Sequence, residues 1–162
     1  MKLNGLISTF PKHVKLFIAA FVIVLSIGFF TGLLFVSQTN SNTPNGMVEN
    51  YLGNENIDDA KTMIFKKGDR EMLTILHTHI LSLSFIFFFL GGLISITSLS
   101  PKQKSFLMIE PFVSILLTFG GIYLMWKGIL WMKYVVMFSG IVMTIVFIVC
   151  AGAVLFQLFR RK

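Results

Sequence analysis

The stretch that decides the fold is residues 71–92, EMLTILHTHILSLSFIFFFLGG, an apolar run that contains two histidines. At 1.5 Å per residue, a helix of this length crosses a hydrocarbon layer of about 30 Å, so the pattern predicts a membrane span. Moving an imidazole into hydrocarbon is unfavourable unless it meets a partner. His77 and His79 are therefore the first candidates for a functional site.

The composition places the chain in the membrane class. Of its 162 residues 55% are hydrophobic, including 18 Phe and 9 Met, which is far from the composition of a soluble domain. The formal charge of +7 comes from basic residues that flank the apolar runs. This is the distribution that orients membrane proteins, and it does not predict nucleic-acid binding.

Several kinds of chemistry are excluded by the absence of their motifs. Cys150 is the only cysteine, so an intrachain disulfide, a zinc ribbon, thioredoxin chemistry and covalently attached c-type haem are all excluded. The sequence has no phosphate loop, HExxH motif or Ser/His/Asp arrangement. Whether the chain takes part in an enzyme stays open, but alone it offers no catalytic motif.

Four apolar segments are long enough to cross a membrane, at about residues 14–36, 71–98, 105–126 and 131–159. They predict an all-α fold: an integral membrane four-helix bundle, antiparallel, in one domain over residues 1–162. Between the first two spans lies a loop of about 34 residues, 37–70. Its apolar residues recur at helical spacing over 47–52 and stop at Gly53, which fits either a short surface helix or a loop with a few anchoring residues.

The basic residues indicate an orientation. An even number of spans puts both termini on one side, and the tails with the 99–104 turn carry more Lys and Arg than the opposite side. The positive-inside rule then predicts cytoplasmic termini in a bacterial inner membrane, with residues 37–70 outside. Trp126, Trp131 and Tyr134 near the last hairpin fit an interfacial aromatic belt.

The two histidines share a level with several methionines. Both imidazoles are expected roughly 9 to 12 Å below the outer end of the second span. Met125 lies near the outer end of the third span, and Met132 and Met137 lie near the outer start of the fourth. Imidazole and thioether ligands suit a haem b iron or a copper ion. These five residues are therefore candidate cofactor ligands.

Helix geometry limits this idea. Residues two apart on a helix point about 200° apart, so His77 and His79 cannot both ligate one metal. No other predicted span supplies a histidine. A haem would need a methionine, a five-coordinate iron, or a histidine from a second copy of the chain. The alternative is that both imidazoles hydrogen-bond to backbone or hydroxyl groups and have only a packing role.

Glu110 is the second polar intrusion into an apolar span. It directly precedes Pro111, which removes a backbone hydrogen bond and disfavours helical geometry at Glu110, so we expect either a kink or first helical turns that lie at the interface. The carboxyl group either bonds locally, to Ser105 or a nearby lysine, or accepts a proton or a quinol head group at the inner surface.

Three segments together resemble a group of small bacterial four-span inner-membrane proteins of uncharacterised activity. They are MVENYLGNE (47–55), EMLTILHTHILSLSFIFFFLGG (71–92) and FLMIEPFVSILLTFGGIYLMW (106–126), and the resemblance extends over residues 47–140. Shared features are an extracytoplasmic Y-x-G segment and an E-[LM] pair before H-x-H. The resemblance implies the four-span architecture and draws attention to Glu71, His77 and His79, but it implies no activity.

Two functions follow as hypotheses. The first is an outer-leaflet histidine site that binds haem b or copper, in or beside a respiratory chain. The second is a non-catalytic accessory or scaffolding subunit of a larger membrane complex, in which the histidines are merely packed. Expected partners are the lipid bilayer, a second copy of the chain, or subunits of a respiratory complex.

Overall fold

The computed structural model describes residues 4–55 and 62–160, and within these ranges every regular element is a helix. Four helices are long and apolar enough to cross a membrane, which confirms the predicted all-α bundle. In chain order the elements are η1 (Leu6–Thr9), α1 (Lys12–Gln38), α2 (Pro44–Leu52), α3 (Asp69–Ser95), α4 (Pro101–Trp126) and α5 (Met132–Phe159).

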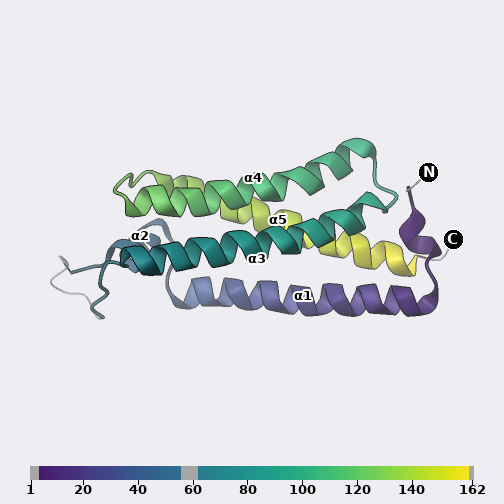
Figure 1. Cartoon of the computed structure of the whole chain (residues 1–162), viewed down its shortest axis with the longest axis horizontal. Coiled ribbons are helices and arrows are strands. Elements are labelled where there is room, and N and C mark those ends of the chain that lie inside the picture. The colour runs from purple at the N-terminus through teal and green to yellow at the C-terminus, as the bar shows by residue number, and fades with distance from the viewer. Residues whose placement is uncertain (1–3, 56–61, 161–162) are drawn as a thin grey trace.

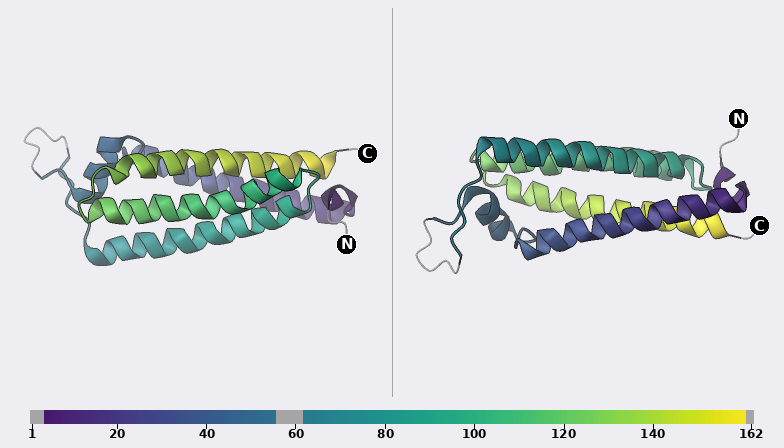
Figure 2. Two further views of the ribbon diagram at one scale, coloured as in Figure 1. Left: turned by 90° about the horizontal axis from the view of Figure 1, so that it is seen from above. Right: turned by 60° about the horizontal axis from the view of Figure 1, so that its bottom comes forward.

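The four long helices lie side by side, and each runs antiparallel to the one before it (Figures 1 and 2). Both termini lie at one end of the bundle, which we call the terminal end, and α2 lies at the other, which we call the α2 end. Helices α4 and α5 pack along each other, α3 lies mainly against α4, and α1 contacts α5. The α4–α5 hairpin is therefore the centre of the bundle.

Small and hydroxyl-bearing residues join α4 to α5. Gly121 lets the two backbones approach so closely that a Cβ atom there would lie 2.7 Å from Val136 Cγ2. One turn away, the buried hydroxyls of Thr118 and Ser139 hydrogen-bond at 2.7 Å. Close backbone approach and interhelical hydrogen bonds are what hold helices together in lipid, where apolar burial gives little driving force.

Aromatic rings join α1 and α3 to this hairpin. Phe29 of α1 stacks on Phe147 of α5 with centroids 3.9 Å apart. Phe87 of α3 meets both rings edge-on, at 6.5 Å from Phe29 and 6.2 Å from Phe147. Each ring lies more than two turns from either end of its helix, so this cluster sets the depth of the three helices relative to one another.

At the terminal end, α3 stops at Ser95 rather than near residue 98. The carbonyl of Thr97 accepts a hydrogen bond from the Gly5 N–H, and the Ser98 N–H and hydroxyl both donate to Gln157 Oε1. The chain after Ser95 therefore binds η1 and the end of α5 instead of continuing the helix.

Helix α4 begins at Pro101, four residues earlier than expected. Ser100 and Gln103 form a capping box, and Pro101 occupies the first helical position, where its missing N–H costs nothing. Pro101 thus separates α3 from α4 as the first residue of the later helix. The helix then continues through Pro111 to Trp126.

Residues 47–52 belong to helix α2, so the short surface helix, one of the two predicted alternatives, is confirmed. Thr43 caps it by accepting a hydrogen bond from the Gly46 N–H, and it ends at Gly53, whose φ of +84° favours glycine. The side chain of Asn54 is buried, and its Oδ1 accepts a hydrogen bond from the backbone N–H of Ile64, with 2.7 Å between nitrogen and oxygen. Burial against the bundle raises the pKa of the Tyr51 hydroxyl above its usual 10.0.

Candidate functional site

His79 is the better oriented of the two histidines. Its Nδ1 lies 2.8 Å from the carbonyl oxygen of Ile75, one turn earlier on α3. Because a carbonyl can only accept, Nδ1 carries the hydrogen of this bond, and in the neutral imidazole Nε2 is then the nitrogen with the lone pair. The ring stacks on Phe119 of α4, with centroids 5.2 Å apart and planes 28° apart. His79 nevertheless remains an exposed residue, so its ring is oriented without being enclosed by the bundle.

His77 is also exposed, but none of the described side chains hydrogen-bonds or ion-pairs with its ring. It points about 200° away from His79 around the helix axis. The two imidazoles therefore face different surroundings, as the two-residue spacing predicts.

The candidate methionines occupy different environments. Met125 is fully buried and Met132 is nearly so, and the Met132 methyl group lies beside Gly121 in the α4–α5 contact. Met137 is only partly buried. Met125 and Met132 thus serve as core residues, and using either as a ligand would require the core to repack. Within the described ranges, no three His, Cys, Asp or Glu side chains converge as a metal site.

Glu71 lies in the first turn of α3 and is exposed. Its carboxylate accepts a hydrogen bond from Lys67 Nζ at 2.6 Å. An acidic residue in this turn is also favoured by the helix dipole. Glu71 therefore stabilises the start of α3, about six residues before His77.

Glu110 bonds along its own helix. Its Oε1 accepts a hydrogen bond from the Ser114 hydroxyl, one turn further on, and not from Ser105. Its Oε2 is buried and has no hydrogen-bond partner among the described residues. Ser114 was missed by the sequence reasoning, although its four-residue spacing from Glu110 is the signal that could have found it.

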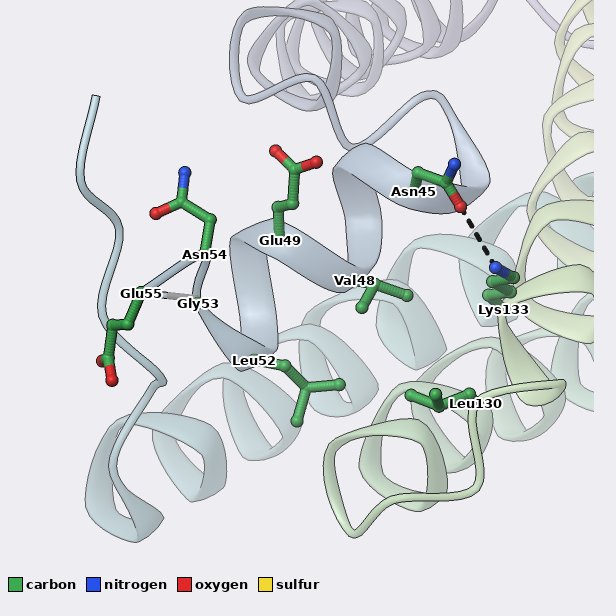
Figure 3. Close-up of a pocket in the computed structure, with 9 residues that line it drawn as sticks. All are labelled: Asn45, Val48, Glu49, Leu52, Gly53, Asn54, Glu55, Leu130 and Lys133. Carbon is green, nitrogen blue, oxygen red and sulfur yellow. Dashed lines mark hydrogen bonds between the residues drawn. The ribbon is translucent and has the colours of Figure 1, made fainter. Parts of the chain in front are cut away.

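A shallow groove of about 370 Å³ opens at the α2 end, between α2 and the α4–α5 turn (Figure 3). Lys133 donates to Asn45 Oδ1 at 3.1 Å across one side of it. Val48 and Leu52 point from α2 toward Leu130. The remaining lining residues are Glu49, Gly53, Asn54 and Glu55. The two carboxylates point away from the apolar floor, so they do not converge on one point.

Comparison with known proteins identifies the domain but no relative with an assigned activity. Neither a curated protein nor a solved structure matches the chain. One family model, Aq_1264_TM, described as a transmembrane helical domain, matches residues 41–162, which contain α2 to α5. The chain is accordingly a multi-pass membrane protein, and it belongs to this family of transmembrane helical domains.

Proposed function

We propose that the chain is a subunit of a membrane complex and that it presents His79 as one ligand to a haem b iron or a copper ion. The observation that carries the proposal is the hydrogen bond from His79 Nδ1 to the Ile75 carbonyl. Metal-ligating histidines almost always donate their other ring N–H in this way, which fixes the tautomer and the ring orientation. Stacking on Phe119 restricts the ring further.

The second ligand in this proposal comes from another chain. Met125 and Met132 are packed into the core, and His77 points away from His79 on the same helix. Because one accessible imidazole per chain is available for the site, the simplest complete arrangement pairs His79 with the same residue of a second copy. Bound haem or copper would supply one-electron transfer near the α2 end of the bundle.

The experiment compares two adjacent histidine variants. The full-length protein, His79→Ala and His77→Ala are each made in haem- and copper-replete cells and purified in detergent. Reduced-minus-oxidised spectra and metal analysis are then recorded. We expect wild type and His77→Ala to retain the same cofactor and His79→Ala to lose it. A colourless, metal-free wild-type preparation, or equal loss in both variants, would contradict the proposal.

A second candidate function is a non-catalytic accessory subunit, and the exposed faces of α1 and α3 favour it. Phe17 and Phe88 are 74% and 66% exposed, and Gly92 has open space around it. In this case His79→Ala leaves the complex intact, whereas Gly92→Leu, which adds bulk only on the outside, releases the partner. Native electrophoresis of solubilised membranes separates the two functions.

A further inference from the structure

A second open pocket, of about 430 Å³, lies at the α2 end where α3 begins and α4 ends. It is lined by Lys66, Lys67, Gly68, Asp69, Trp126 and Lys127. We call it the basic pocket, because three of these six residues are lysines. It lies apart from His79, which is ten residues further along α3.

Trp126 forms the aromatic wall of the basic pocket. The residue is only 5% exposed, and its indole N–H donates to the Lys67 carbonyl at 2.9 Å. Its ring is therefore held in one orientation, and it is buried rather than part of a freely exposed belt. Lys127 Nζ lies 4.4 Å from the ring centroid and Lys66 Nζ lies 5.3 Å from it. Two ammonium groups thus share one indole.

The charges around the basic pocket favour an anion. Lys67 is paired with Glu71 at 2.6 Å, and Lys127 has Asp69 at the longer distance of 3.7 Å. Asp69 is 83% exposed, so water screens this second pair. Lys66 has no carboxylate partner among the described residues. Because both ammonium groups lie close to the same ring, the distance between them is within roughly one Debye length, about 10 Å at 0.1 M salt. The two charges therefore repel each other, and an anion between them would relieve this repulsion.

The position of the basic pocket identifies the kind of anion. Trp126 is the last residue of α4 and Asp69 is the first of α3, so the pocket lies where two membrane-spanning helices leave the apolar layer. Tryptophan and lysine side chains are typical of this level, at which lipid phosphates lie. We propose that the basic pocket binds the phosphate of an anionic phospholipid, with Lys66 and Lys127 as its main contacts.

The experiment uses the full-length protein in nanodiscs of phosphatidylcholine with increasing phosphatidylglycerol, and native mass spectrometry counts the retained phosphatidylglycerol. The test variant is Lys66→Gln with Lys127→Gln. The control, Lys12→Gln with Lys102→Gln, makes the same charge change with exposed residues at the terminal end. Lys66→Arg with Lys127→Arg keeps the charge. Circular dichroism verifies that each variant is folded.

We expect retention to fall about tenfold in the test variant and to stay near wild type in the control and the arginine variant. Equal loss in test and control variants would overturn the proposal, because it would mean diffuse attraction to a negative surface. Inorganic phosphate is then added in pure phosphatidylcholine. Its binding is measured there and again in nanodiscs that contain phosphatidylglycerol. If phosphate binds the wild type with the same dependence on Lys66 and Lys127, and phosphatidylglycerol does not reduce this binding, the site takes a free anion and the lipid assignment is wrong.

Discussion

The α4–α5 hairpin and the outer helices α1 and α3 are similarly apolar but hold their places differently. In their most apolar stretches, 44% of residues are buried in α4 and in α5, against 22% in α1 and 11% in α3. The two helices of the hairpin are joined by the close contact at Gly121 and by the hydrogen bond between Thr118 and Ser139. Helices α1 and α3 contact Phe147 of the hairpin through the rings of Phe29 and Phe87. In lipid, then, hydrophobicity does not decide which helix becomes core; the buried helices are those whose small and hydroxyl-bearing residues contact each other.

The largest expected effect comes from adding bulk to the hairpin contact. Gly121→Leu drives a side chain into Val136, a stiff β-branched residue 2.7 Å from the new Cβ atom. We expect a loss of about 3 kcal/mol in the free energy of unfolding, measured by denaturation in mixed micelles. The neighbouring Gly120→Leu is the control, because nothing lies within 4 Å of a Cβ atom there. Equal losses in both variants would show that the hairpin is not packed through Gly121.

Loosening the aromatic contact tests the outer helices. Phe29→Ala removes the ring that stacks on Phe147 and meets Phe87, and we expect it to cost about 2 kcal/mol, with proteolysis of α1 becoming faster. Phe17→Ala, on the same helix but 74% exposed, should change neither quantity. If Phe29→Ala destabilised the bundle more than Gly121→Leu, the ranking of the two regions would be reversed.

Removing a hydroxyl should have a smaller effect, and only in the hairpin. Thr118→Val deletes the bond to Ser139, although Ser139 keeps the carbonyl of Val135 as a partner at 2.8 Å. We expect a loss of about 1 kcal/mol. Thr31→Val on α1 removes a hydroxyl that bonds only to its own helix, at Gly28, and should be neutral. The difference between the two variants in thermal unfolding is the measurement.

The smallest effect concerns α2, which packs against the hairpin. Burial raises the pKa of Tyr51 above 10.0, so the folded state keeps the hydroxyl proton more tightly than the unfolded state does. The stability that the neutral hydroxyl contributes is therefore complete below pH 10.0. It is lost as the pH rises through the higher pKa of the folded state. Tyr51→Phe should remove this part of the alkaline destabilisation. Unfolding followed above pH 10.0 checks it, with the exposed Tyr134→Phe as control. A steeper alkaline loss in Tyr51→Phe would contradict it.

Hydropathy and turn chemistry predicted most of the fold, because the bilayer forces apolar runs of this length into helices. They did not predict Gln157, a buried polar residue in an apolar helix whose partner Ser98 lies 59 positions away. A contact so distant in sequence leaves no local pattern. The start of α4 at Pro101, four residues before the predicted residue 105, has a local cause instead, the capping box of Ser100 with Gln103.

The candidate site could be predicted in part. That His77 and His79 point in different directions follows from helix geometry alone. The hydrogen bond from His79 to the Ile75 carbonyl is local to α3, but the stacking of His79 on Phe119 comes from another helix, and the periodicity of α3 carries no information about that contact. The position of Met125 in the core, at 0% exposure, likewise depends on how α4 and α5 pack rather than on its depth in the membrane.

The family match begins at residue 41, after α1, and this has a topological consequence. The described part of residues 41–162 holds three helices long and apolar enough to span a membrane, an odd number, so α2 and the end of α5 lie at opposite ends of the bundle. Adding α1 makes the number of these helices even, and the N-terminal segment then lies at the same end of the bundle as the end of α5 (Figure 1). There η1 binds the turn after α3, and Gln157 binds the same turn from α5. With α1, the number of candidate membrane-spanning helices becomes even, and η1 and the end of α5 both bind the turn after α3.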